Sequence, residues 1–397
     1  MKTVSHAWWA TVALFLLHGL IVATWVSRIP AVQIALNMSN GILGSTLLCL
    51  ALGAVVAIPF TGFLIHRYGS KRVSSLAACA FCIVLILPAL ASNALTLGVA
   101  LFVFGATAAA MDVSMNAQGV EVEKKLGKPT MSRFHGMFSL GAMVGAGIGG
   151  FVAAHGIGPR PHFFGSAVIY LAATVLVSPL LLDSHEAAVP GEHAGQNRLP
   201  LTKIPRVLLV LSAIGFCMLL SEGAMADWTA VYLRQVLNAG PGTAAAGYSV
   251  FSAAMAIFRF LGDWITSKLG PRAAVRSGSI LGALGLVWAL CMRSPGWTMP
   301  GFALVGAGFS VIIPLVFGSG GRVENVNPGV GIATVTGIGY VGFIVGPPTI
   351  GFVSQVVTLR YALLVVVACC LVSALLSGAL SNRSSPDTQG RELDLPA

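Results

Sequence analysis

The chain has 397 residues, of which 56% are hydrophobic and only 9% are charged, and its formal net charge is +10. A water-soluble domain carries about 25% charged residues, so this composition excludes a soluble globular protein and predicts a chain largely covered by lipid. The positive charges lie in short loops rather than on one basic face, which argues against a nucleic-acid partner.

Twelve apolar stretches follow one another, each close to the ~20 residues that a helix needs to cross the hydrocarbon of a bilayer. The first stretch is too long for the apolar region of a signal peptide, so we expect it to be retained as a span. The expected spans are 8–27, 41–63, 73–92, 95–117, 133–154, 163–182, 207–229, 244–264, 275–293, 298–318, 330–353 and 361–380. The sequence therefore predicts an all-α membrane protein with twelve transmembrane helices.

One long polar segment divides these spans into six and six. We expect an N-terminal six-helix bundle over 1–182, a cytoplasmic linker over 183–206, a C-terminal six-helix bundle over 207–380 and a disordered cytoplasmic tail over 381–397. The fifth span of each half is rich in glycine, and internal repeats of this kind are typical of secondary transporters. Because one chain holds both bundles, we expect it to function as a monomer.

The distribution of basic residues predicts the orientation of the chain in the membrane. With twelve spans, seventeen of the 23 lysines and arginines fall on the side of both termini, five fall on the other side and one lies within a span. The positive-inside rule then places both termini in the cytoplasm, and the inner (cytoplasmic) membrane of a bacterial cell is the expected location.

The loop after the second span has a recognisable pattern. It reads Gly62-Phe63-Leu64-Ile65-His66-Arg67-Tyr68-Gly69-Ser70-Lys71-Arg72. This resembles the signature loop of the major facilitator superfamily, G-x-L-x-D-R-x-G-x-R/K-R/K, with His66 in place of the usual aspartate. The resemblance implies the major facilitator fold of two pseudo-symmetric bundles and transport by alternating access. It also implies that the glycines form a tight turn and that the loop acts as a gate, through Gly62, His66, Arg67, Gly69, Lys71 and Arg72.

Two further stretches, Met111–Gly119 and Ser221–Trp228, resemble the fucose-permease-like branch of that superfamily. This resemblance implies proton-coupled transport of a small polar solute. The first span has no acidic residue, so a sugar–proton site that uses a carboxylate from that span does not carry over to this chain.

Charged residues within the spans are the candidates for the proton site. A charge at the bilayer centre costs about 2.5–3.5 kcal/mol on insertion scales, and such residues mark substrate or proton pathways. Glu222 lies ~22 Å along the seventh span, where desolvation favours the protonated form of a carboxyl. It is therefore the first candidate for proton coupling, and the alternative is a structural carboxyl bonded to a neighbouring helix. Asp112 is the second candidate; with Asn116 on the same helix face it either contacts the solute or clamps helix ends.

The remaining candidates line a cavity or close it. Arg259 lies one turn before Asp263, so a local ion pair is the simplest prediction, and bidentate binding of an anionic solute by Arg259 is the alternative. Trp25 and Tyr340 are further candidates for the cavity wall. Asp227 near the outer surface and Asp263 are assigned to gating.

No pattern in the chain indicates an enzyme, a metal site or an organic cofactor. The run Gly145–Gly150 matches G-x-G-x-x-G but lies inside a span, where close helix packing explains it better than a dinucleotide. The sequence thus predicts a secondary active transporter for a sugar-like or other small polar metabolite, with protons as the partner in symport. The alternative is a drug–proton antiporter for multidrug efflux, because the fifth span resembles the antiporter motif, although Ala146 replaces its proline.

Overall fold

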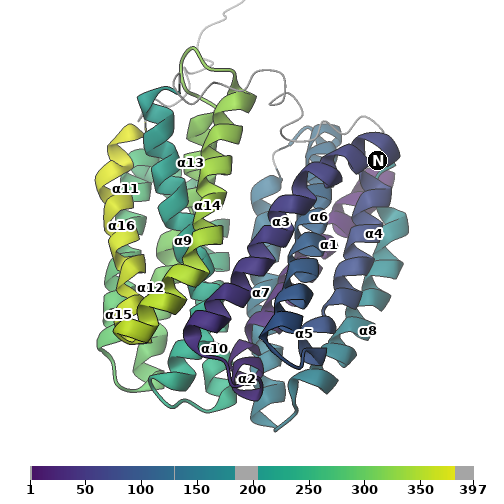
Figure 1. Ribbon diagram of the computed structural model, residues 1–397. Coiled ribbons are helices and arrows are strands. Elements are labelled where there is room, and N and C mark those ends of the chain that lie inside the picture. The colour runs from purple at the N-terminus through teal and green to yellow at the C-terminus, as the bar shows by residue number, and fades with distance from the viewer. Residues whose placement is uncertain (1, 129, 184–203, 381–397) are drawn as a thin grey trace, which may run out of the picture.

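The computed structural model describes residues 2–128, 130–183 and 204–380 (Figure 1). Almost all of the predicted linker and the whole predicted tail, 381–397, lie outside these ranges. The described residues are helical without strands, which confirms the predicted all-α fold. The helices of the first half are α1 (Lys2–Val26), α2 (Ile29–Ala35), α3 (Asn40–Tyr68), α4 (Ser70–Val84), α5 (Leu87–Leu90), α6 (Ala94–Leu126), α7 (Met131–Ala154) and α8 (Pro159–Val177).

The second half is also built from long helices and shorter helical pieces. Its helices are α9 (Arg206–Gln235), α10 (Pro241–Phe260), α11 (Gly262–Cys291), α12 (Pro295–Phe309), α13 (Ile312–Gly320), α14 (Pro328–Val356), α15 (Leu359–Ala362) and α16 (Leu364–Leu376). Each predicted span falls mainly on one helix or on a consecutive pair such as α12 and α13. Among the described residues, eleven helical stretches are long and apolar enough to cross a membrane. The predicted span that is not among these eleven is 244–264, which corresponds to α10, whose 20 residues include Arg259 and several small or hydroxylated side chains.

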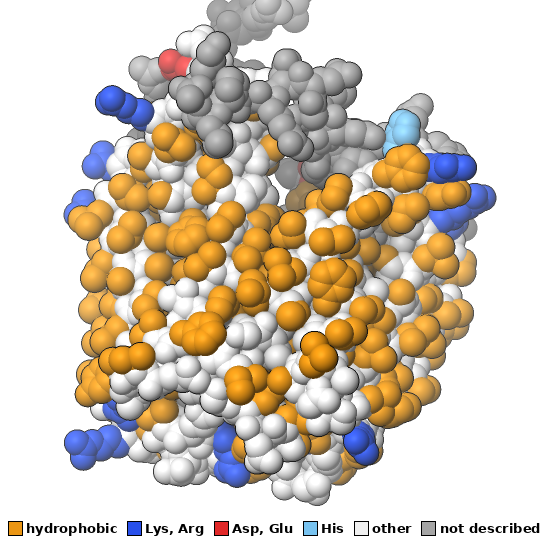
Figure 2. Space-filling model, viewed as in Figure 1, with side chains coloured by type: hydrophobic (Ala, Val, Ile, Leu, Met, Phe, Trp, Pro, Cys, Tyr) orange, Lys and Arg blue, Asp and Glu red, His pale blue; other side chains and the backbone are white. Residues whose placement is uncertain are grey.

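The two halves lie side by side and meet along two helix pairs (Figure 1). Helix α7 contacts α10, and α3 contacts α14. In Figure 1, α3 and α14 are close together at the end that carries α2 and α15, and they diverge toward the end that carries the N-terminus. Hydrophobic side chains cover the middle of the face seen in Figure 2, while lysines and arginines gather at its two ends, as expected for a protein embedded in a bilayer.

The signature loop turns at only one of its two glycines. Gly69 separates α3 from α4 with φ 81° and ψ 153°, a conformation that glycine adopts without strain. Gly270 has nearly the same angles, φ 76° and ψ 160°, at the corresponding place in the second half. Gly62 lies inside α3, so the prediction that it forms part of the turn was wrong: the helix continues to Tyr68.

Glycines allow the long helices of each half to pack backbone against backbone. A Cβ added to Gly141 of α7 would lie 2.2 Å from the Leu16 carbonyl oxygen of α1, and one added to Gly342 of α14 would lie 2.3 Å from that of Phe216 in α9. These are equivalent helix pairs in the two halves. A Cβ at Gly145 would lie 2.7 Å from the Leu20 carbonyl oxygen, so the glycine-rich run packs helices as predicted.

A substitution at one of these crossings gives the first testable prediction. In Gly105→Ala, the new Cβ of α6 would lie 1.9 Å from the Leu50 carbonyl oxygen of α3, which cannot move without shifting the helix. We expect destabilisation of about 3 kcal/mol or more, measured as thermal unfolding of the protein in detergent. The matched control is Gly165→Ala in α8, where the added Cβ has no neighbour within 4 Å. This control should be neutral or stabilising by up to about 1 kcal/mol, and equal unfolding temperatures for the two variants would contradict the prediction.

Candidate functional site

A cavity of about 490 Å³ lies between the two halves. Its wall takes residues from α1, α6 and α7 of the first half and from α9, α10, α11, α13 and α14 of the second. It reaches Ser132 in the first turn of α7 and Thr266 near the start of α11, so it extends toward the end of the molecule that carries the N-terminus. A larger hollow of about 670 Å³, between α3, α6 and α14, is lined without any charged side chain and is therefore not the candidate site.

The opposite end of the seam is closed by direct contacts between the halves. The Gln235 side-chain amide donates to Gln33 Oε1 at 3.0 Å. The Gln355 side-chain amide donates to Ser39 Oγ at 2.8 Å. The cavity is thus accessible from one end of the molecule and closed at the other.

An ion pair within the second half lies in the cavity wall, and a hydrogen bond links it to the first half. Arg259 Nη2 of α10 donates to Glu222 Oε1 of α9 at 3.3 Å, and its Nη1 donates to Ser139 Oγ of α7 at 2.7 Å. The side chains of Arg259 and Glu222 are 12% and 21% exposed, and both line the cavity. One guanidinium therefore connects two helices of the second half with one helix of the first.

The predicted pair of Arg259 with Asp263 was wrong. An i, i+4 pair requires one continuous helix, but α10 ends at Phe260 and α11 begins at Gly262. The break turns Asp263 to an exposed position at the mouth of the cavity. The partner of Arg259 is Glu222 instead, 37 residues away in the sequence.

Asp112 of α6 lines the same cavity. The Asn116 side-chain amide donates to the Asp112 carbonyl oxygen at 2.8 Å and to its Oδ1 at 3.1 Å, so these residues share a face as expected for i and i+4. Asn116 supports Asp112 and does not itself line the cavity. The structure thus brings both predicted proton sites, Asp112 and Glu222, to one cavity.

Of the other predicted residues, one lines the cavity and two do not. Tyr340 of α14 lies in the wall. Trp25 does not: it is 1% exposed and packs inside the first half against Phe104 and Phe163, with ring centroids 6.5 and 6.4 Å away. Its assignment to the cavity was wrong because it points into the bundle. Asp227 is half-buried on α9 and does not line the cavity, so its role in an outer gate stays a prediction.

Several polar residues of the site were not among the predicted site residues, and Ser139 and His18 are two of them. Ser139 holds Arg259, and His18 of α1 lies in the wall with its Nε2 3.2 Å from the Ala108 carbonyl oxygen of α6. His18 could have been found from the sequence, because an ionisable residue in the middle of a span is a candidate functional residue. Ser139 has no such signal, because a single serine in a glycine-rich span is ordinary helix packing.

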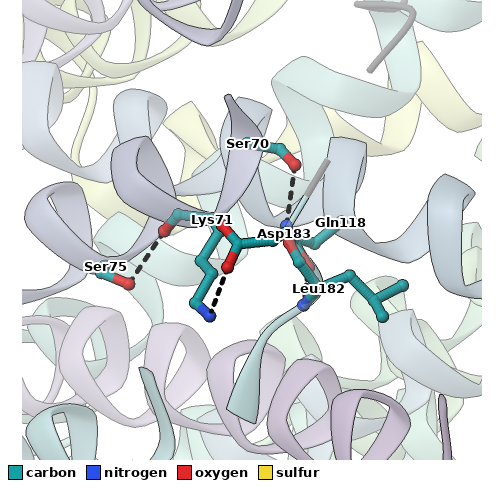
Figure 3. Close-up of polar contacts among 6 residues, drawn as sticks. All are labelled: Ser70, Lys71, Ser75, Gln118, Leu182 and Asp183. Atoms are coloured by element: carbon teal, nitrogen blue, oxygen red, sulfur yellow. Dashed lines mark hydrogen bonds and ion pairs between the residues drawn. The ribbon is translucent and has the colours of Figure 1, made fainter. Parts of the chain in front are cut away.

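The signature loop lies beside a hydrogen-bond network within the first half (Figure 3). Buried Gln118 of α6 donates to Ser70 Oγ at 2.7 Å and to the Leu182 carbonyl oxygen at 2.9 Å, and it accepts from the Leu182 amide at 3.1 Å. Lys71 Nζ pairs with Asp183 Oδ2 at 3.1 Å. These contacts hold the start of α4 against α6 and the segment that follows α8.

The remaining basic residues of the loop are exposed. The Arg67 guanidinium lies 5.5 Å from the ring centroid of Tyr68, and Arg72 and His66 lie on the surface. The contacts described for the loop join helices of one half. Their part in gating stays a prediction, since a gate has to join the two halves.

The chain is similar in sequence to membrane transporters of one family. The sequence model described as "Major Facilitator Superfamily" matches residues 7–323. An uncharacterised MFS-type transporter of Yersinia pestis is 35% identical over 371 residues, which cover 93% of this chain and 93% of that protein. The membrane protein MosC of Rhizobium meliloti is 31% identical over 365 residues, covering 91% of this chain and 86% of that protein.

Solved structures show the same fold. The inward-facing, occupied structure of a bacterial homologue of the human lysosomal transporter Spinster superposes with a TM-score of 0.73 at 14% identity, covering 96% of this chain and 99% of that one. The Escherichia coli fucose:proton symporter FucP superposes with a TM-score of 0.63 at 16% identity, covering 94% and 98%.

Proposed function

The chain belongs to the Major Facilitator Superfamily, and on that premise we propose that it carries a small polar solute by alternating access in symport with protons. Members of this family are multi-pass membrane transporters and not enzymes. The observation that carries the proposal is the cavity between the halves, which is open at one end, closed at the other and contains a cross-helix ion pair. Alternating access requires a central cavity that is open to only one side of the membrane at a time.

The proposed orientation follows from the basic residues. With both termini in the cytoplasm of the bacterial inner membrane, the open end of the cavity faces the cytoplasm. The conformation described here is then the inward-open one. Both bundles belong to one chain, so we propose that a monomer suffices for transport.

Glu222 is the proposed proton carrier. While its carboxyl is ionised, it holds Arg259, which in turn bonds Ser139 of the other half. Protonation removes the charge of the carboxyl and weakens the ion pair, so Arg259 can change its partners. Because Arg259 connects α7, α9 and α10, a change in its contacts can alter how the halves meet. Asp112 remains the second candidate for this role.

Drug–proton antiport is the second candidate function. The observation that favours it is the aromatic content of the cavity wall, since aromatic and apolar surfaces bind many drug-like molecules. The aromatic side chains in the wall are Phe15, Phe138, Phe317, Tyr340 and Phe343.

Transport in sealed liposomes tests the proposal. A pH gradient is imposed on purified, reconstituted protein, and the uptake of labelled sugars, nucleosides, organic acids, amines and cationic drugs is followed. We expect at least one solute to accumulate on the side toward which protons flow, and a protonophore should abolish that accumulation. Accumulation on the other side supports antiport. Accumulation that is unchanged by the protonophore contradicts proton coupling.

A further inference from the structure

The charges in the cavity wall are unbalanced. Among the described residues that line the cavity, Arg259 is the only lysine or arginine, and Glu222 already neutralises it. Asp112 has a hydrogen bond from Asn116 but no cationic side chain beside it among the described residues. A carboxylate left without a counter-charge in an apolar site is costly, and either a bound proton or a cationic ligand removes that cost.

We propose that the transported solute is a small organic cation, and specifically a protonated amine whose ammonium group binds at Asp112. This inference rests on the proposed function, because it names the class of solute for the same cavity. It also separates the roles of two carboxylates in the cavity wall: Glu222 serves the proton and Asp112 serves the solute.

His18 lies against the helical turn that precedes Asp112. His18 Nε2 faces the Ala108 carbonyl oxygen at 3.2 Å, and a carbonyl only accepts, so this nitrogen is the donor and Nδ1 of the neutral ring is an acceptor. His18 is 7% exposed, and its Nδ1 is buried without a hydrogen-bond partner among the described residues. Ala108 lies one helical turn before Asp112 on α6, so His18 and Asp112 occupy the same part of the wall. An ammonium group has three donors and no acceptor, which suits the carboxylate of Asp112.

Aromatic rings complete the surroundings expected for a cation. The ring of Phe138 lies 5.4 Å from that of His18, and the rings of Tyr340 and Phe343 lie 6.0 Å apart in the part of the wall that α14 supplies. The face of an aromatic ring attracts a cation within about 6 Å, and the attraction increases when water is excluded. Such a wall favours a cation over a neutral sugar of the same size.

The same contacts disfavour an anionic solute. Both terminal nitrogens of Arg259 are engaged, one by Glu222 and one by Ser139, so an anion has to displace Glu222 to bind in the bidentate way. Only Nε of Arg259 lacks a partner among the described residues, and a single N–H does not offset the negative charge of Asp112.

A binding experiment on purified protein in detergent tests the inference without requiring transport. The probes are three sets of molecules that share a skeleton but differ in charge: glucosamine, glucose and glucuronate; ethanolamine, ethylene glycol and glycolate; phenethylamine, phenethyl alcohol and phenylacetate. Binding is measured by thermal shift and by calorimetry. We expect the amine of at least one set to bind about tenfold or more tightly than its alcohol, a difference of about 1.4 kcal/mol, and the acid to bind most weakly.

Two variants show where the amine binds. Asp112→Asn keeps the size of the side chain and should abolish the preference for the amine. Glu324→Gln, which removes a carboxylate from an exposed turn between α13 and α14, should leave it unchanged. The inference is overturned if no amine binds, if an alcohol or acid binds as well as its amine, or if Asp112→Asn retains the preference.

Failure of this inference is distinguishable from failure of the proposed function. A neutral or anionic solute that binds and is accumulated in liposomes by a proton gradient contradicts the inference and leaves proton-coupled transport in place. An amine that binds at Asp112 but is never accumulated supports the inference and contradicts the proposed transport.

Discussion

Replacing Glu222 with glutamine is expected to abolish proton-driven accumulation of the solute while exchange of labelled for unlabelled solute continues. Glutamine keeps an oxygen that can accept from Arg259 Nη2, the contact that spans 3.3 Å in the native protein, but it cannot carry a proton. A gradient of one pH unit is worth about 1.4 kcal/mol and supports about tenfold accumulation at one proton per solute. In the variant the accumulation ratio should fall to about one.

The measurement compares accumulation and counterflow in the same liposomes. Glu324→Gln serves as the matched control, because it makes the same chemical change outside the cavity, and it should accumulate solute normally. Normal accumulation by Glu222→Gln would remove Glu222 as the coupling site and leave Asp112 as the candidate. Loss of counterflow at an unchanged unfolding temperature would place Glu222 in solute binding.

Locking the closed end of the seam is expected to stop transport. A Cβ added to Gly150 of α7 would lie 3.4 Å from the Ala245 Cβ of α10, close to the 3.5–4.5 Å typical of disulfides. The double variant Gly150→Cys, Ala245→Cys should therefore form a cross-link between the halves on oxidation. Because alternating access requires this end to open, we expect the transport rate to fall about tenfold or more and to recover on reduction.

A cross-link within one half controls for the chemistry of oxidation. A Cβ added to Gly98 of α6 would lie 3.3 Å from Sγ of the native Cys49 in α3, so Gly98→Cys can form a disulfide inside the first half. Rigid-body motion of the halves does not change that distance, and transport should persist when this variant is oxidised. Full activity of the oxidised double variant, with the cross-link shown on a gel, would exclude opening at this end.

The error at Arg259 illustrates what helix periodicity does and does not predict. Positions 259 and 263 are one turn apart only while the helix continues, and the break near Leu261 separates them. The true partner, Glu222, comes from another helix, and pattern reasoning has no information about which faces of two distant helices meet. The same reason explains Trp25: an aromatic residue near a span end has the same pattern whether it faces a cavity or the bundle interior.

Apolar length and the placement of charges were enough to predict the all-α membrane fold and the six-and-six order of the spans. These are local properties: a helix in lipid must satisfy its own backbone hydrogen bonds and cover the hydrocarbon, whatever its neighbours are. The charged candidates were also visible locally, because a charge within a span is rare and costly.

Tertiary structure alone decided which of those charges meet. The pairing of Arg259 with Glu222 and Ser139, the position of His18 beside the helix of Asp112, and the closure of one end of the seam all depend on packing between segments far apart in the chain. Such contacts follow from the shape of whole helix faces, which no short stretch of sequence contains.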